Sequence, residues 1–124
     1  MYDVIILGSG PAGYTAALYT SRAFLKTLVL TGPEIGGQLT TTLEVENYPG
    51  FAKGTLGPQL MEEMKRQVER FGTEIKIESV VSLEPSIVSL GEKKFIIKTE
   101  DNEYQGKSVI IATGASAQYL GLPS

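Results

Sequence analysis

The stretch that decides the fold is Asp3-Val4-Ile5-Ile6-Leu7-Gly8-Ser9-Gly10-Pro11-Ala12-Gly13-Tyr14-Thr15-Ala16-Ala17. Residues 4–7 are apolar with a β-branched bias, which indicates a strand buried on both faces. A Gly-x-Gly-x-x-Gly turn follows at 8–13 and leads directly into an alanine-rich helix. Strand, glycine turn and helix in this order are typical of a dinucleotide-binding βαβ unit.

Each glycine of this turn has its own physical task. Gly8 permits the tight turn, and Gly10 lets the main chain approach a pyrophosphate. Gly13 lets the helix lie close to the strand, and Ala17, one turn later, keeps that contact small. Pro11 stands where a missing N–H costs nothing, and the remaining free N–H groups and the helix dipole favour an anion. The alternative, a glycine turn that merely packs a βα unit, does not require this whole context, so we favour dinucleotide binding.

Composition bounds the possible functions. The chain has 124 residues, which predicts one domain at most, and its net charge is −3. Its 11 basic residues are scattered, which argues against nucleic-acid binding, and no apolar run is long enough to span a bilayer. With no basic signal-peptide region before the first strand, a cytoplasmic location is expected.

The chain contains no Cys and no His. It therefore offers no disulfide, no thiolate and no histidine base, and it lacks the commonest metal ligand. We expect no catalytic side chain and no metal in this segment, so a bound cofactor has to carry any redox chemistry.

After the first helix, expected at residues 11–22, residues 26–31 indicate a second parallel strand. Dinucleotide sites of this kind usually place an acidic residue near the end of that strand to bind the ribose. Here Thr31 stands at that place and Glu34 follows three residues later, and the sequence does not choose between them. No Arg stands nearby to pair with a 2′-phosphate, which argues against NADP at this site.

The next loop is rich in glycine and hydroxyl groups. Gly36 and Gly37 could present amides to a second anion, and Gln38 could bind polar groups of a ligand. Composition alone favours the simpler interpretation, a solvated turn. An aromatic and proline-rich corner follows at 44–51, with Asn47 in its middle.

A second helix is predicted from about Pro58 to about Phe71, with Gly72 ending it. Its charged residues form a solvated face, and its apolar residues form one stripe that should pack on the sheet. This stripe consists of Leu60, Met61, Met64, Val68 and Phe71.

From residue 73 the hydrophobic period changes to two. We expect a third parallel strand within 74–83, then short antiparallel strands at 87–90, 94–99 and 103–105. A last apolar strand at 108–111 ends in the small-residue turn Ala112-Thr113-Gly114, which should meet the first glycine turn at the carboxyl ends of the strands. The predicted fold class is α/β, a three-layer Rossmann-like fold with a central parallel sheet, helices on one face and a β-meander on the other.

Several motifs together resemble one family, the bacterial-type low-molecular-weight thioredoxin reductases. Two of them, at 6–17 and 110–117, occur in many flavoproteins with two dinucleotide domains. The more specific ones are Gly36-Gly37-Gln38-Leu39-Thr40-Thr41-Thr42, Glu44-Val45-Glu46-Asn47-Tyr48-Pro49-Gly50 and Tyr119-Leu120-Gly121-Leu122-Pro123. They span the chain in the family's order, and Thr31 also matches the family.

The resemblance implies FAD as the cofactor and reverses the preference for a solvated turn at 36–38. It assigns Gly8, Ser9, Gly10, Pro11, Ala12 and Gly13 to the pyrophosphate. It assigns Thr31, Gly32, Glu34, Gly36, Gly37, Gln38 and Leu39 to the adenosine and pyrophosphate side, Asn47 to the flavin end, Val80 to the adenine, and Ala112, Thr113 and Gly114 to the phosphates.

In this family NADPH reduces FAD, FAD reduces a Cys-x-x-Cys pair, and that dithiol reduces thioredoxin; members are homodimers. The resemblance therefore implies that residues 1–124 are the N-terminal part of an FAD-binding domain. The NADPH domain and the C-terminal half of the FAD domain are absent from this sequence, so the domain is incomplete. We expect the chain alone to be inactive as a reductase.

Two other hypotheses compete with this one. The chain could be a non-catalytic flavin-binding or dinucleotide-binding module, or a subunit of a split enzyme whose site another chain completes. It could also be an NAD-binding dehydrogenase domain, which leaves the motifs at 36–42 and 44–50 unexplained.

Overall fold

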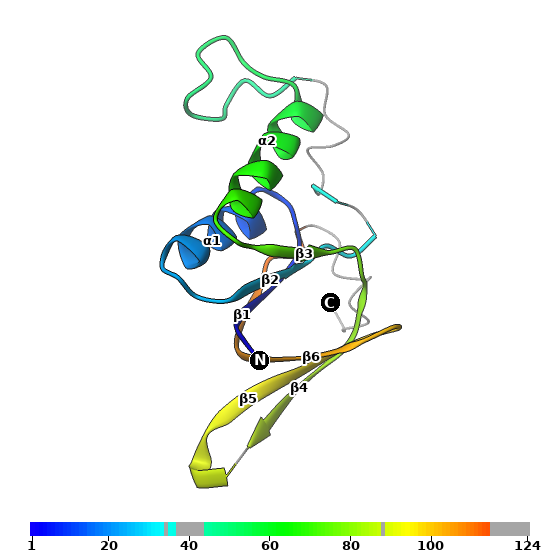
Figure 1. Ribbon diagram of the computed structural model, residues 1–124. Coiled ribbons are helices and arrows are strands. Elements are labelled where there is room, and N and C mark those ends of the chain that lie inside the picture. Colours follow the sequence, from blue (N-terminus) through cyan, green and yellow to red (C-terminus); the bar gives the residue numbers. More distant parts are fainter. Residues whose placement is uncertain (34, 37–43, 88, 115–124) are drawn as a thin grey trace.

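The computed structural model describes residues 1–33, 35, 36, 44–87 and 89–114. These residues form a six-stranded sheet in the order β3-β2-β1-β6-β5-β4, with two α-helices (Figure 1). The elements are β1 (Tyr2–Leu7), α1 (Pro11–Arg22), β2 (Thr27–Leu30), α2 (Gly57–Arg70), β3 (Glu74–Lys76), β4 (Val80–Ile87), the 3₁₀ turn η2 (Ser89–Gly91), β5 (Lys93–Thr99) and β6 (Glu103–Ile111). No helix among these residues is long and apolar enough to cross a membrane.

The predicted βαβ unit is present. β1 pairs in parallel with β2 on one side and with β6 on the other, so it is central in the sheet. α1 has the predicted bounds, and β2 lies within the predicted strand at 26–31.

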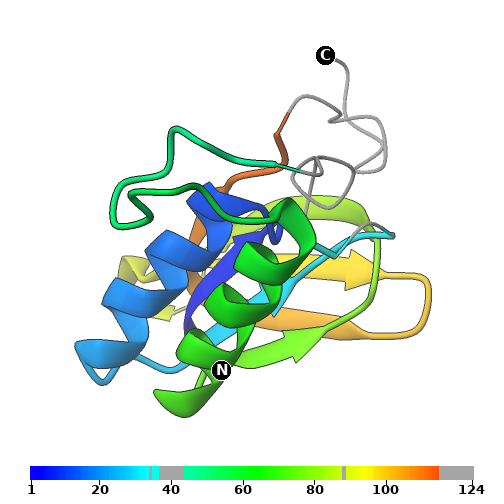
Figure 2. The same ribbon diagram turned by 90° about the horizontal axis from the view of Figure 1, so that it is seen from above.

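The two helices cover one face of the sheet side by side (Figure 2). Val4, Ile6 and Val29 of the strands pack there against Tyr14 and Val68 of the helices. All five side chains are buried, so this face and the helices form one continuous core.

One residue of the predicted apolar stripe of α2 is not buried. The helix ends at Arg70, and Phe71 beyond it is 36% exposed. The guanidinium carbons of Arg22 and Arg70 lie 5.8 and 5.0 Å from the centre of its ring, which is the geometry of cation–π contacts. The prediction of a buried Phe71 is therefore wrong, because the helix stops one residue earlier than its hydrophobic period.

The opposite face of the parallel strands is covered by the meander. Ile5 and Leu7 alternate with the residues that face the helices, and they pack with Val80 of β4 and Ile97 of β5. The sheet curves so that β4 and β5 extend away from the helices (Figure 1). The meander is thus the third layer, and the predicted fold class is confirmed.

The strand boundaries in this half differ from the prediction. Only Glu74–Lys76 forms the third parallel strand, and Val80–Ile87 runs antiparallel to β5. The strict alternation covers only Glu74–Glu78, and the apolar residues that follow at 80–83 do not reveal that the chain changes partners. After Ile87, η2 occupies the place of the strand predicted at 87–90.

The two strands predicted at 103–105 and 108–111 are one strand, β6. It pairs antiparallel with β5 over Glu103–Gly106, and from Gly106 onward it pairs in parallel with β1. A Cβ at position 106 would lie 2.9 Å from the side chain of Ile5, so glycine lets β6 lie close to β1 at the residue where its pairing passes from β5 to β1.

Candidate functional site

The turn after β1 is where three strand ends meet. The Gly8 N–H donates to the Leu30 carbonyl at 2.9 Å, and the Ala112 N–H donates to the Leu7 carbonyl at 2.8 Å. The ends of β1, β2 and β6 are thereby held together. The predicted meeting of the first glycine turn with the Ala112 turn is confirmed.

Two glycines of this turn are required by packing. Gly8 has φ +117°, and a Cβ there would lie 2.0 Å from the Ala112 carbonyl oxygen. A Cβ on Gly13 would lie 2.1 Å from the Gly8 carbonyl oxygen. Any side chain at either position would push the strand ends or α1 apart.

Gly10 is different. It is the N-cap of α1 with φ −77° and ψ −171°, an extended conformation that any residue adopts. Backbone conformation therefore does not require glycine at position 10.

The N-terminus of α1 fits a phosphate group. In the described part of the chain it has no side-chain cap and no acidic residue in its first turn, and Pro11 occupies its first position. The exposed Ala12 lies next to Pro11 on the same turn. First-turn N–H groups without a side-chain acceptor, at the positive end of the helix dipole, suit a diphosphate.

The structure also places Gly36 at this turn. The Ser9 hydroxyl is buried and accepts the N–H of Gly36 at 2.9 Å. This contact ties the glycine-rich loop to the phosphate end of the site. Of the predicted residues nearby, Glu34, Gly37, Gln38 and Leu39 lie outside the residues that the structure describes.

At the end of β2, the Thr31 hydroxyl is buried and donates to the Gly32 carbonyl at 2.7 Å. Of the two residues considered for the ribose, Thr31 thus already has a main-chain acceptor. The N–H groups of Thr31 and Gly32 donate to the carbonyls of Lys76 and Glu78, both at 3.0 Å. The end of β2 is therefore fixed by the chain that leaves β3.

The remaining predicted residues lie in different surroundings. Val80 has a side chain only 4% exposed in the meander-side core, which leaves its main chain for any contact with an adenine. Thr113 and Gly114 follow Ala112 at the meeting of the turns. Asn47 is exposed in the loop 44–56, which extends beyond the N-terminal end of α2 (Figure 1).

Two features were not predicted from the sequence. Tyr14, directly after the glycine turn, is 1% exposed, and burial raises its pKa to about 12. Glu78 receives hydrogen bonds from Thr99, Asn102 and Tyr104, three residues more than 20 positions away in sequence. The helical period could have predicted the burial of Tyr14. No local sequence pattern predicts the hydrogen bonds of Glu78.

One hollow among the described residues lies away from the glycine turn. A hollow of about 440 Å³ lies between the loop 44–56 and α2, and it includes no residue of the glycine turn. Among the described residues there is no group of three or more His, Cys, Asp or Glu side chains that could hold a metal. The candidate site is identified here by the chemistry of the turn.

Comparison with known proteins identifies the family of this chain. The family model described as pyridine nucleotide-disulphide oxidoreductase matches residues 2–124. The chain belongs to this family. Family membership and the relatives below imply FAD as the cofactor, and they confirm the resemblance to the N-terminal part of thioredoxin reductases.

The relatives are much longer than this chain. A thioredoxin reductase of Vibrio cholerae is 54% identical over 98% of the chain and 36% of its own length. A Pseudomonas fluorescens protein named glucosaminate ammonia-lyase is 52% identical over 98% of the chain and 36% of its own length. The crystal structure of Lactococcus lactis thioredoxin reductase in the FR conformation matches all of the chain and 39% of its own, with a TM-score of 0.82 and 44% identity. The chain thus spans just over a third of these relatives.

Proposed function

We propose that this chain is the part of a thioredoxin-disulfide reductase that holds the pyrophosphate and adenosine of FAD. The observation that carries the proposal is the uncapped N-terminus of α1, where Gly10 has an ordinary backbone conformation and yet no side chain. A diphosphate needs both the free N–H groups and the open approach.

The chain's own residues bind and orient. Gly8 and Gly13 allow the strand ends and the helix to come together, and Ser9 holds Gly36 beside them. Ala112, Thr113 and Gly114 complete the phosphate side, while Thr31, Gly32 and Val80 line the adenosine side and Asn47 the flavin end. FAD, when bound, supplies the redox chemistry for which this chain has no Cys or His.

The activity of the whole protein is part of the same proposal. Relatives named thioredoxin reductase support thioredoxin as the partner. The proposal takes NADPH as the electron donor, a homodimer as the assembly and the cytoplasm as the location from the resemblance to that family. The ammonia-lyase named above shares the segment almost as closely. We therefore assign cofactor binding to residues 1–124 and the choice of substrate to residues outside them.

A module completed by a second chain is the other candidate. It is favoured by one observation: β6 pairs with β1 on one side over Ser108–Ile111, and Ile111 is 57% exposed. Among the described residues no strand pairs with the other side of this strand end, and its apolar surface is exposed, which are features of an interface.

An absorption spectrum of the purified chain separates these candidates. We expect partial occupancy by flavin, because part of the cofactor contacts should come from residues outside the chain. Flavin that binds only after addition of the C-terminal part of a relative would support a split site. Retention of NAD in place of FAD would contradict the proposal.

A further inference from the structure

Glu78 connects two regions that the family motifs do not connect. It lies in the short segment 77–79 between β3, at the parallel edge of the sheet, and β4, the first strand of the meander. Its main chain and its side chain bind to different parts of the molecule.

The main chain of this segment binds the end of β2. The Glu78 carbonyl accepts the N–H of Gly32, and the Lys76 carbonyl accepts the N–H of Thr31, both at 3.0 Å. Thr31 and Gly32 are the residues proposed for the adenosine side, and Val80 follows two residues after Glu78. The position of Glu78 therefore affects both sides of the adenosine site.

The Glu78 side chain binds the turn between β5 and β6. Its Oε1 accepts the Thr99 hydroxyl at 2.6 Å and the Asn102 amide at 3.0 Å, and its Oε2 accepts the Tyr104 hydroxyl at 2.6 Å. Thr99 in turn accepts the main-chain N–H of Asn102 at 3.0 Å. One carboxylate thus holds a turn that is more than 20 residues away in sequence.

The charge of the Glu78 carboxylate suits its role as the acceptor of these hydrogen bonds. Burial by itself raises the pKa of Glu78, but the hydrogen bonds from Thr99, Tyr104 and Asn102 outweigh it and lower the pKa. Because all three partners donate, an ionised carboxylate is the acceptor that satisfies them.

We propose that Glu78 is a positioning residue for the adenosine half of the cofactor, because it fixes Thr31, Gly32 and Val80 against the β5–β6 turn. This inference rests on the proposed function. It adds a residue that does not touch the cofactor but determines how well the adenosine side is preorganised.

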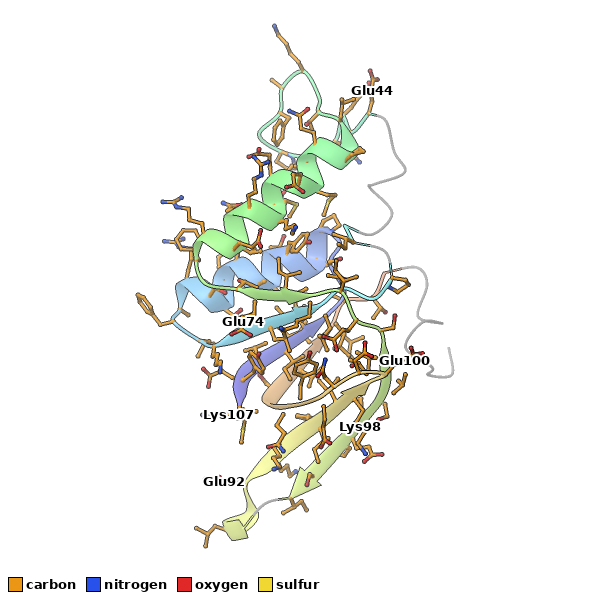
Figure 3. The ribbon with its side chains drawn as sticks, turned by 45° about the vertical axis from the view of Figure 1, so that its right-hand side comes forward. Glu44, Glu74, Glu92, Lys98, Glu100 and Lys107 are labelled. Carbon is orange, nitrogen blue, oxygen red and sulfur yellow. The ribbon has the colours of Figure 1, made fainter. Side chains whose placement is uncertain are left out.

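The test compares Glu78→Gln with Glu74→Gln. Glu74 is a matched control, because its carboxylate accepts one hydroxyl hydrogen bond, from Tyr2, at the same sheet edge. It lies on β3, apart from the β5–β6 turn that Glu100 marks (Figure 3). Fluorescence titration of the chain with FAD, ADP and FMN separates the adenosine half of the cofactor from the flavin half.

We expect Glu78→Gln to weaken FAD and ADP binding about tenfold while FMN binding changes less than about twofold. Glu74→Gln should leave all three within about twofold. A global loss of structure would weaken the three ligands together, so equal losses, or no loss in Glu78→Gln, would overturn the inference.

Hydrogen exchange at the Thr31 and Gly32 amides gives a second readout that needs no ligand. Faster exchange in Glu78→Gln but not in Glu74→Gln supports the inference, and equal protection in both overturns it. If the unmodified chain binds neither FAD nor ADP, the proposed function fails for this chain, while the exchange measurement still decides the role of Glu78.

Discussion

The glycine turn and the Glu78 segment both hydrogen-bond to the end of β2, through Leu30 and Gly32, and they are built differently. The turn is made by main chain, from Gly8 to Gly13 with Ala112 against it. The cluster is made by side chains, with a carboxylate from the β3–β4 connection and donors from β5, β6 and their turn.

The two regions differ in how well they tolerate substitution. A Cβ added at the turn would collide with a carbonyl group that cannot move unless its strand also moves. When one side chain of the cluster is removed, water can replace its hydrogen bond. Changes at the turn should therefore abolish folding or binding, and changes at the cluster should only weaken them.

The largest effect is expected for Gly8→Ala. The new Cβ would lie 2.0 Å from the Ala112 carbonyl oxygen at a φ of +117°, so we expect more than about 4 kcal/mol of destabilisation, measured by urea unfolding. Gly72→Ala is the control, because its φ is +95° but nothing lies within 4 Å of the new Cβ. It should cost only about 1 kcal/mol. Similar losses in the two variants would mean that the close packing of the turn is not the cause.

Ile97→Ala tests whether the meander is part of the same core. Ile97 is fully buried and packs with Ile5, Leu7, Leu28 and Leu30 of the parallel strands. We expect a loss of about 3 kcal/mol in the free energy of unfolding, in a single cooperative transition. If the meander unfolded separately while the parallel strands stayed folded, the two regions would not share a core.

Glu78→Gln should reduce stability by about 1–2 kcal/mol at neutral pH. Because the folded-state pKa of Glu78 is lowered, its stabilising contribution is complete above its ordinary pKa of 4.5 and is lost as the pH falls through the lowered value. The difference between parent and variant should therefore shrink as the pH falls below about 4.5, in unfolding curves recorded at several pH values. A difference that is constant down to acid pH would show that the carboxylate charge is not what holds the β5–β6 turn.

The smallest effect is expected for Arg66→Ala on the outer face of α2. Its ion pair with Glu62 spans 3.2 Å, but the two side chains are 69% and 53% exposed. The free energy of unfolding should change by less than about 0.5 kcal/mol. A loss above 1 kcal/mol would indicate that this face of α2 is covered by something else.

The turn, α1, the amphipathic α2 and the fold class could be predicted because their signals are local. Glycine spacing and the helical period each lie within about 15 residues, as at Gly8–Gly13 and Leu60–Val68. The burial of Phe71 was predicted wrongly, since the hydrophobic period runs one residue past the end of the helix.

The change of partners in β6 and the Glu78 cluster could not be predicted. Gly106 stands between the strands predicted at 103–105 and 108–111, and glycine is needed there because the Ile5 side chain lies against it in the fold. Glu78 looks like an exposed strand residue until the fold brings Thr99, Asn102 and Tyr104 to it. Such contacts depend on topology rather than on local sequence.

The most direct test of the account is to titrate the Gly10→Val variant with FAD and to measure the thermal unfolding of the same variant. Thr15→Val, on the exposed side of α1, is the control. Gly10 has an extended backbone that valine accepts, so the variant should stay folded, with a loss of about 1 kcal/mol or less from the poorer N-cap. The account predicts that the parent and Thr15→Val bind FAD and that Gly10→Val, folded, does not. Flavin binding by Gly10→Val equal to that of the parent would contradict it.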